Sequence, residues 1–252
     1  MKVCIVIPMY NEEEIAKHSI ETIVSYTRKL PPIITILVVN DGSEDATENN
    51  VRQMINEQGN DDLKLVSHSV NQGYGAALIT GIGFAVDNNY DYALFMDSDL
   101  TNHPKYLQKF YEKMVDGCDY IKATRYAKGG AIVGVPLQHK ILSSMGNLLA
   151  KILYGIPLTD LTNGFRAVKV DILRKMSLSE PGFSIIMEEL YHVKYLAQSF
   201  CDIPYVLTSR DDGQGKSKFS YGPRTYFRYL KYPVKSFLQS LKSRLIQDQK
   251  LY

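Results

Sequence analysis

Short apolar runs alternate with longer helix-like segments through the first half of the 252-residue chain, and this alternation constrains the fold more than any other feature. Strands that alternate with helices of this length predict βαβ units and a mostly parallel sheet. The expected strands are Val3–Ile7, Ile33–Val39, Leu63–Ser67 and Tyr92–Met96, and the expected helices are Glu12–Arg28, Ala46–Glu57, Gly75–Val86 and Lys105–Val115.

The second half of the chain is less regular. Glycines at positions 129, 130 and 134 indicate a loop, and the stretch Asp160–Arg166 is rich in turn-forming residues. We expect helices at Leu137–Tyr154 and around Glu188–Gln198, and a strand near Pro204–Leu207. Because there is no internal repeat and no obvious linker before Gly213, we predict one α/β domain over residues 1–220 and a C-terminal extension over residues 221–252.

The C-terminal extension is basic and amphipathic. From Arg210 onward, ten Lys or Arg residues face only three carboxylates. Apolar residues recur there at helical spacing between these cations, and we expect Pro233 to divide the segment into two helices. A basic amphipathic helix can lie in an anionic lipid interface, although the same pattern fits a helix packed on the protein core with solvated lysines.

Composition and cysteine usage restrict the setting. Hydrophobic residues at 45% and charged residues at 22% are typical of a globular protein, and a net charge of +2 does not indicate a nucleic-acid partner. No stretch approaches the ~20 apolar residues of a membrane span, so membrane contact would be peripheral or supplied by a membrane-anchoring partner subunit. Three cysteines far apart favour reduced thiols in a cytosolic compartment over a disulfide framework.

The most informative polar residues follow the expected strands. Asp97 and Asp99 end an apolar run and present two carboxylates, which suit Mg²⁺ or Mn²⁺ bound to a diphosphate. The plainer interpretation of this pair is a solvated acidic turn. Open α/β sheets bind ligands beyond the carboxyl ends of their strands, and the position of the pair therefore favours the metal site.

Three other strand ends carry weaker signals. Asp41, in Asn40–Ser43, can accept hydrogen bonds from a nucleobase, or the stretch can simply cap the next helix. In Pro8–Glu12, Tyr10 can stack on a base, although an ordinary strand-to-helix turn explains the stretch equally well. Asn71–Gly75 carries two glycines before a helix, which fits either an anion-binding turn or plain helix initiation.

Taken together, these stretches resemble the family-2 glycosyltransferases, which invert the anomeric centre of the transferred sugar. Thr124–Tyr126, Asp160–Arg166 and Gly215–Lys218 are further similar to dolichyl- and polyprenyl-phosphate mannosyl- and glucosyltransferases. The resemblance covers roughly residues 3–220. It implies a single-domain GT-A fold for nucleotide-diphospho-sugars, with a mostly parallel central sheet flanked by helices and with amphipathic helices at the C-terminal end.

The resemblance also implies roles for individual residues. Nucleoside contacts fall to Pro8, Tyr10, Glu12 and Asp41, and metal and donor contacts to Asp97 and the catalytic Asp99. The acceptor phosphate meets Arg125, with His139 and Lys140 as a second basic pair, and Arg210, Ser217 and Lys218 belong to a loop that closes over the diphosphate.

Some positions depart from the pattern of this family. Thr101 stands where a Gln or Ser is often a further metal ligand, His139 and Lys140 replace an Arg-rich pair, and Asn40 replaces the first of two aspartates. The spacing from Arg210 to Gly215 is longer than usual, which weakens the role of that arginine.

A lipid-phosphate acceptor explains why cations, rather than a base, are expected at the acceptor site. A phosphate monoester with a second pKa near ~6 is largely dianionic at neutral pH and needs no proton removed before it attacks. Glu188 and Glu189 are the alternative bases, and for Glu188 we favour an orienting role. We expect Asp160 and Arg166 to pair within their turn, as scaffold near the acceptor site.

The sequence thus predicts an inverting hexosyltransferase at the cytosolic face of a membrane, with polyprenyl or dolichyl phosphate as acceptor. It leaves GDP- and UDP-sugars open as donors and gives mannose a slight preference. One alternative is a family-2 enzyme that acts on a polysaccharide or protein hydroxyl. Another is a non-catalytic relative that only binds nucleotide sugars. A dinucleotide-dependent oxidoreductase is disfavoured because Gly-x-Gly-x-x-Gly is absent.

Overall fold

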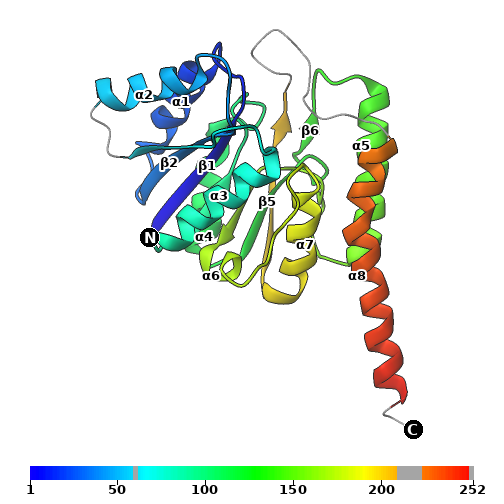
Figure 1. The fold of residues 1–252 in the computed structure, drawn as a ribbon. Coiled ribbons are helices and arrows are strands. Elements are labelled where there is room, and N and C mark those ends of the chain that lie inside the picture. Colours follow the sequence, from blue (N-terminus) through cyan, green and yellow to red (C-terminus); the bar gives the residue numbers. More distant parts are fainter. Residues whose placement is uncertain (59–61, 209–222, 250–252) are drawn as a thin grey trace.

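The computed structural model describes residues 1–58, 62–208 and 223–249, which form a mixed sheet covered by helices on both faces (Figure 1). Among these residues, seven strands follow the order β3-β2-β1-β4-β7-β5-β8, and β6 pairs separately with β9. The strands are β1 (Lys2–Met9), β2 (Ile33–Asn40), β3 (Leu63–Ser67), β4 (Tyr92–Phe95), β5 (Tyr120–Thr124), β6 (Ala131–Ile132), β7 (Arg166–Lys169), β8 (Phe200–Pro204) and β9 (Val206–Leu207).

Most neighbours in the large sheet are parallel, as the sequence predicts. β1 pairs in parallel with both β2 and β4, and β5 pairs in parallel with β8. The exception is β7, which is antiparallel to β4 and to β5. The helices are α1 (Ala16–Thr27), α2 (Thr47–Gln58), α3 (Tyr74–Asp87), the 3-10 turn η1 (Pro104–Tyr106), α4 (Leu107–Val115), α5 (Leu137–Tyr154), α6 (Val170–Leu173), α7 (Ile185–Leu196) and α8 (Pro223–Gln249).

The core lies on both faces of the sheet, and β1 shows why its sequence is continuously apolar. Ile5 and Ile7 enter one hydrophobic cluster, with side chains of α1, α2 and α4. Cys4 and Val6 enter the other, with side chains of α3, α5 and α7. A strand buried on both faces gains from an apolar residue at every position, so the predicted strands of the first half are confirmed within a few residues of their expected ends.

Three strands of the second half, β5, β6 and β7, were not predicted. β5 begins five positions after the last residue of α4, β6 is only two residues long, and β7 contains the charged residues Arg166 and Lys169. Arg166 is nonetheless fully buried, because its guanidinium pairs with Glu189 of α7. An apolar-run criterion cannot detect a strand whose buried charge is neutralised by a distant partner.

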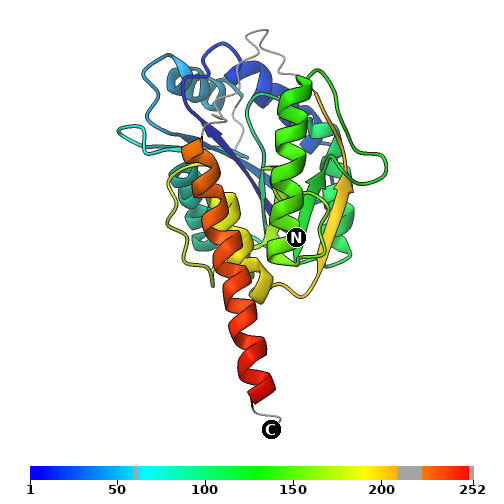
Figure 2. The same cartoon turned by 90° about the vertical axis from the view of Figure 1, so that its right-hand side faces the viewer.

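The expected break at Pro233 is wrong, since α8 is one helix that continues through this proline. Tyr232, Pro233 and Ser236 are all buried in this part of the helix. Figures 1 and 2 show α8 lying along the body of the molecule and extending beyond it at its C-terminal end. Packing of α8 against α5 and α7 compensates for the hydrogen bond that the proline cannot donate. Within the described ranges, no helix is both long and apolar enough to cross a bilayer.

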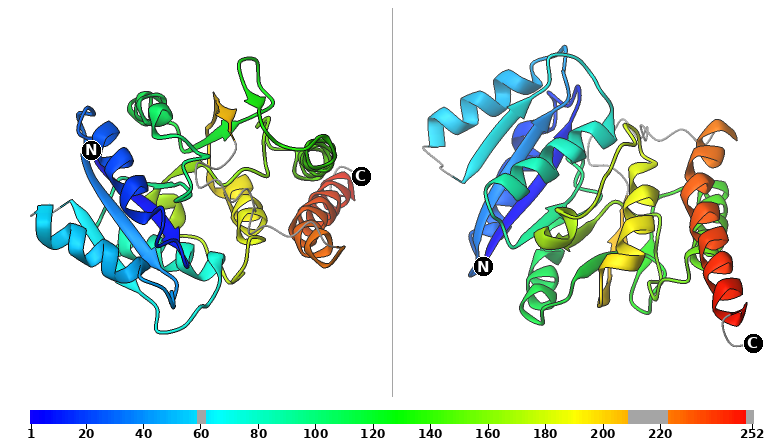
Figure 3. Two further views of the ribbon diagram at one scale, coloured as in Figure 1. Left: turned by 90° about the horizontal axis from the view of Figure 1, so that it is seen from above. Right: turned by 60° about the horizontal axis from the view of Figure 1, so that its bottom comes forward.

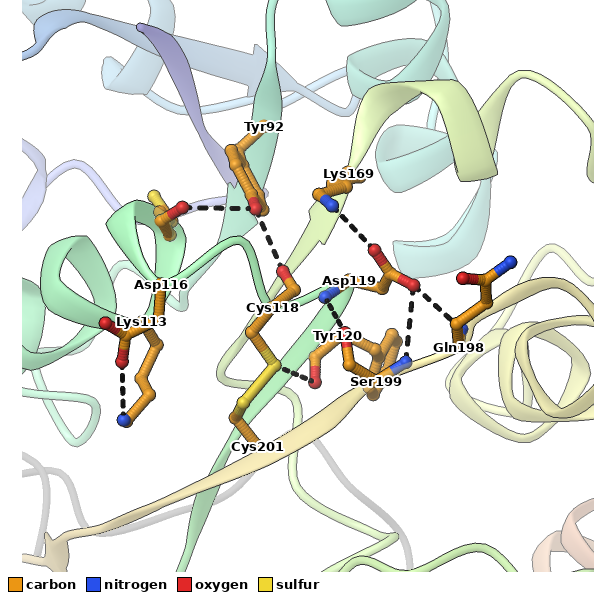
Figure 4. The surroundings of a disulfide bond; sticks show 11 residues. Tyr92, Lys113, Asp116, Cys118, Asp119, Tyr120, Lys169, Gln198, Ser199 and Cys201 are labelled. Atoms are coloured by element: carbon orange, nitrogen blue, oxygen red, sulfur yellow. Dashed lines mark hydrogen bonds and ion pairs between the residues drawn. A yellow bond between two sulfur atoms is a disulfide. The ribbon is translucent and has the colours of Figure 1, made fainter.

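The prediction of reduced cysteines is also wrong for two of the three. Cys118 and Cys201 form a disulfide, although 83 positions separate them in the sequence (Figure 4). The parallel pairing of β5 with β8 aligns Ile121 with Cys201 and brings the two cysteines together. Only Cys4 is a free thiol, and it is buried. The argument for a cytosolic compartment from unpaired cysteines therefore loses its basis.

Candidate functional site

Polar residues that follow β1, β2 and β4 meet at one edge of the sheet. Because these strands are parallel, their carboxyl ends open on the same side. A cavity of about 630 Å³ lies there, which we call the carboxylate cavity. Its wall brings together the described residues predicted to hold nucleotide and metal, namely Pro8, Tyr10, Glu12, Asp41, Asp97 and Asp99.

Neighbouring side chains orient the two carboxylates after β4. Asp97 Oδ1 accepts a hydrogen bond from the Tyr74 hydroxyl at 3.3 Å, and Asp97 Oδ2 accepts one from the Asn102 amide at 2.9 Å. Asp99 Oδ1 accepts from Thr101, from the backbone N–H at 3.1 Å and from the hydroxyl at 2.7 Å. Thr101 therefore orients Asp99 in this structure.

Asp97 and Asp99 fit a divalent cation that is shared with a diphosphate. Their hard carboxylate oxygens are ligands that Mg²⁺ and Mn²⁺ prefer. No cluster of three or more His, Cys, Asp or Glu residues with suitable geometry occurs in the described part of the chain. Mg²⁺ sites commonly combine one or two carboxylates with water and substrate phosphate oxygens, so a pair of aspartates is a sufficient protein contribution.

Asp41 is the centre of a buried hydrogen-bond network. Its Oδ1 accepts from the Gln72 N–H at 2.9 Å and lies 2.7 Å from His68 Nδ1, while its Oδ2 accepts from the Gly73 N–H at 2.8 Å. His68 Nε2 lies 2.8 Å from the Thr80 hydroxyl. Asp41 thus ties the segment before α3 to the end of β2, a structural role that the sequence did not indicate. Its contact with a nucleobase stays a prediction.

Protein groups occupy the N-terminus of α3. The N–H groups of Gly75 and Ala76 donate to the Pro181 carbonyl oxygen, at 2.7 and 3.3 Å. A Cβ on Gly75 would lie 2.1 Å from the Glu180 carbonyl oxygen, so this close approach requires glycine. Of the two interpretations of Asn71–Gly75, helix initiation agrees with the structure, because the N–H groups that were to bind an anion donate to Asp41 and Pro181.

A second cavity, of about 570 Å³, has walls formed mainly by side chains of α5, α7 and α8, and we call it the apolar cavity. Its apolar lining includes Leu142, Met145, Leu149, Ile186, Leu230 and Pro233. Asp97 and Arg125 are the one acid and the one cation among the described residues that line it. Because Asp97 also lines the carboxylate cavity, the two cavities meet at this residue.

Large apolar side chains are exposed on the two helices beside this cavity. Figure 3 shows α5 and α8 next to each other at one side of the molecule. Met145 of α5 is 63% exposed and Phe227 of α8 is 77% exposed. The others are Leu137, Ile141, Leu142, Leu148, Leu149 and Ile152 on α5, and Val234, Phe237, Leu238 and Leu241 on α8. The sequence indicated such a surface for the C-terminal segment, but not for α5.

Arg125 lines the apolar cavity and is held by Asp160. Arg125 Nε donates to Asp160 Oδ2 at 2.7 Å, and Nη2 donates to Asp160 Oδ1 at 2.9 Å and to the Thr162 hydroxyl at 2.8 Å. Burial alone would lower the pKa of Arg125, but the Asp160 carboxylate outweighs burial and raises it. The guanidinium is therefore permanently charged and fixed in orientation.

The expected pairing of Asp160 with Arg166 is wrong, since each has another partner. Asp160 pairs with Arg125, and Arg166 forms a fully buried ion pair with Glu189. Alternate residues of a strand face opposite sides, and β7 directs Arg166 toward α7, while its Nη1 also donates to the Gly164 carbonyl oxygen at 2.8 Å. Lys122 lies near both pairs, fully buried, and burial followed by repulsion from Arg166 lowers its pKa to about 7.

Glu188 has a role that fits orientation better than proton removal. Its carboxylate accepts hydrogen bonds from the N–H groups of Ser179 and Glu180 and from the hydroxyls of Ser179 and Tyr232. Burial tends to raise the pKa of Glu188, but these hydrogen bonds outweigh burial and lower it. The residue lines neither cavity and instead fastens the loop before α7 to α8.

The remaining predicted residues are not brought to the cavities by the described structure. His139 and Lys140 lie half-buried near the start of α5, outside the wall of either cavity. Arg210, Ser217 and Lys218 fall outside the described residues. Sequence reasoning missed Tyr74 and Phe183, which line both cavities. Tyr74 stood within a motif that was considered only for its glycines.

Comparisons with known proteins agree with this geometry. The model of the family described as "Glycosyl transferase family 2" matches residues 4–177. An undecaprenyl-phosphate mannosyltransferase of Micrococcus luteus is 28% identical over 219 residues, which cover 86% of this chain and 87% of that protein. A polyprenol monophosphomannose synthase of Mycolicibacterium smegmatis is 26% identical, with 93% of this chain and 88% of that protein covered.

Solved structures resemble the fold. Glucosyl-3-phosphoglycerate synthase of Mycobacterium tuberculosis, crystallised with Mn²⁺, uridine diphosphate and glucosyl-3-phosphoglycerate, superposes with a TM-score of 0.61 at 20% sequence identity. The superposition covers 96% of this chain and 79% of that one. At this identity the likeness concerns the fold alone, and it agrees with the GT-A architecture expected from the sequence.

Proposed function

This chain belongs to glycosyl transferase family 2, and on that premise we propose that it transfers a hexose, with mannose favoured, from a GDP- or UDP-sugar to polyprenyl or dolichyl phosphate. One observation carries the proposal. A cavity lined by carboxylates meets an apolar cavity at Asp97, and the wall of the apolar cavity includes the fixed cation Arg125. The relatives named as polyprenyl-phosphate mannosyltransferases support the same substrate class.

The carboxylate cavity is the proposed donor site. Pro8 at the end of β1 and Tyr10 and Glu12 just after it lie on one part of the wall, where a nucleoside would contact them. Asp97 and Asp99 would hold Mg²⁺ or Mn²⁺, which would stabilise the charge that develops on the leaving diphosphate. The metal-bound crystal structures of glucosyl-3-phosphoglycerate synthase support a divalent cation in a protein of this fold.

The apolar cavity is the proposed acceptor site. Arg125 uses Nε and Nη2 for Asp160 and Thr162, and among the described residues nothing accepts from its Nη1, which is left for an acceptor phosphate. A dianionic phosphate needs no general base, and Asp97 is the one carboxylate on the described wall. The apolar lining excludes water around the reacting groups and accommodates isoprenoid carbons.

The exposed apolar residues of α5 and α8 are the proposed contact with a lipid surface. Lys235 of α8 is exposed and would meet anionic headgroups beside these apolar side chains, whereas Lys231 is paired with Glu180. This arrangement would hold the enzyme peripherally at a membrane surface, where a water-insoluble acceptor can enter the apolar cavity. Additional anchoring by a partner subunit is compatible with the same surface.

The test is a panel of GDP- and UDP-sugars assayed with one polyprenyl phosphate, with and without Mn²⁺. We expect transfer from at least one donor, and we expect EDTA or the substitution Asp99→Ala to abolish it. Asp116→Ala, which removes an exposed carboxylate just after α4, is the matched control and should leave transfer intact. Transfer to a water-soluble sugar with none to polyprenyl phosphate would favour the alternative acceptor class. The absence of any Mn²⁺-dependent donor turnover would contradict an enzymatic role.

A further inference from the structure

Three described residues line both cavities: Tyr74, Asp97 and Phe183. A donor held in one cavity and an acceptor held in the other can react only where the cavities meet. These three side chains therefore border the place where the transferred sugar must lie, if the proposed function is correct. Asp97 has a proposed role as a metal ligand, whereas the two aromatic residues have none.

The two aromatic side chains form one unit with Asp97. The rings of Tyr74 and Phe183 are stacked, with centroids 4.6 Å apart and planes inclined by 22°. The Tyr74 hydroxyl is 3.3 Å from Asp97 Oδ1. Because a carboxylate can only accept, the tyrosine is the donor. We propose that Tyr74, braced by Phe183, is a positioning residue that fixes the Asp97 carboxylate for the cation and diphosphate at the junction of the cavities. This inference rests on the proposed function.

Asp97 has a second partner besides Tyr74. Its Oδ2 accepts a hydrogen bond from the Asn102 amide at 2.9 Å, so the carboxylate is oriented from two sides.

Phe183 is braced by the loop that carries it. The Pro181 carbonyl oxygen accepts hydrogen bonds from α3 directly beside Tyr74, and Glu188 accepts from the loop N–H groups at Ser179 and Glu180. Glu180 is in turn linked to Lys231 of α8. The loop is therefore fastened to α3, α7 and α8, and the stacked pair is held between fixed elements.

Gly164 leaves the room that the Tyr74 hydroxyl needs. A Cβ built on Gly164 would lie 3.2 Å from the Tyr74 hydroxyl oxygen and 3.9 Å from Asp97 Oδ2. The shorter distance is closer than an ordinary van der Waals contact, so with an added methyl group the hydroxyl would have to shift by a few tenths of an ångström. Because its hydrogen bond to Asp97 is already 3.3 Å long, alanine at this position is a second way to disturb that bond without altering the residue at position 74.

The experiment measures Mn²⁺ binding by electron paramagnetic resonance in the presence of GDP and, separately, of UDP. Removal of a hydrogen-bond partner of a metal ligand typically weakens metal binding about 10–100-fold, and the long bond here places Tyr74→Phe near the lower end of that range. Tyr90→Phe is the matched control, because Tyr90 is a half-buried tyrosine beside Phe84, remote from both cavities. Thermal unfolding of each variant verifies that it is folded.

A double-mutant cycle distinguishes positioning from general damage. Gly164→Ala should weaken Mn²⁺ binding in the wild-type background but cause little further loss in Tyr74→Phe, which has no hydroxyl to displace. Additive losses would overturn the inference, as would a folded Tyr74→Phe protein that binds Mn²⁺ as tightly as wild type and Tyr90→Phe. Failure of the wild-type chain to bind Mn²⁺ with either nucleotide is a separate result, which would overturn the proposed donor site and this inference with it.

Discussion

The pair Arg125–Asp160 offers the sharpest test of how the acceptor end of the site is built. The substitution Asp160→Asn keeps the size of the side chain but removes its negative charge. The Asp160 side chain is fully buried and that of Arg125 is 11% exposed, so the variant leaves a nearly buried cation without its counter-ion. Lys122, which is fully buried nearby, loses the same compensating charge.

The magnitude follows from this burial. Removal of one partner from a buried ion pair costs about 3–5 kcal/mol. Asparagine retains an oxygen that can still accept from the N–H groups of Thr162 and Asn163, so we expect the lower end, about 3 kcal/mol. For a domain of this size each kcal/mol corresponds to about 2–4 °C in Tm, and the expected loss is about 6–12 °C.

The pH dependence has a definite sign. Burial raises the pKa of Asp160, but Arg125 outweighs burial and the pKa falls below the ordinary value of 3.8. A carboxylate whose pKa is lowered on folding stabilises the protein above its unfolded pKa, and this contribution is lost as the pH falls toward its folded pKa. The difference between wild type and Asp160→Asn should therefore be complete at pH 7 and should shrink below about pH 4.

Urea unfolding followed by far-ultraviolet circular dichroism measures this difference, since the chain contains no tryptophan. Asp116→Asn, in the exposed pair with Lys113, is the matched control and should leave the midpoint unchanged. The Michaelis constant for polyprenyl phosphate should rise in Asp160→Asn, because Arg125 is no longer held in one orientation. A variant as stable as wild type at pH 7 would refute the reasoning.

Three further predictions concern other parts of the molecule. Cys201→Ser should lower the free energy of unfolding by about 2–4 kcal/mol under oxidising conditions but not in reductant. For Cys4→Ser, the change in the free energy of unfolding should be the same under both conditions. Equal stability of Cys201→Ser and wild type without reductant would contradict the disulfide. Met145→Glu should reduce sedimentation with anionic vesicles more than the uncharged Met145→Gln, because its carboxylate is repelled by the anionic surface, and no difference between them would argue against lipid contact by α5. Glu188→Gln should lower Tm while transfer persists, and complete loss of turnover in a folded variant would instead support a base.

The carboxylate cavity could be predicted from the sequence because its residues lie next to strand ends. A parallel strand buried on both faces is apolar at every position, as β1 is, and its end is marked by the first polar residues. Parallel strands open at the same edge, so Tyr10, Asp41 and Asp97 could be brought together without knowledge of their contacts. The site could be predicted because several strand ends carried suitable residues, although the motif at each strand end was weak by itself.

The second half was harder to predict because its contacts are long-range. Nothing near Arg166 in the sequence identifies Glu189 as its partner, and nothing near Cys118 identifies Cys201. Proline at position 233 lowers helix propensity locally, yet burial against neighbouring helices keeps α8 continuous. In each case a tertiary interaction overrides the preference that the local sequence expresses.

The sequence by itself determined the alternating strands and helices, the parallel edge of the sheet and the acidic pair at its end, because these depend on periodicity and on neighbouring residues. Only the tertiary structure decided that Arg125 pairs with Asp160, that Tyr74 and Phe183 stand between two cavities, and that α5 shares an exposed apolar surface with α8. These features depend on which side chains meet across the fold, and a linear pattern does not record the distances between residues that are far apart in the chain.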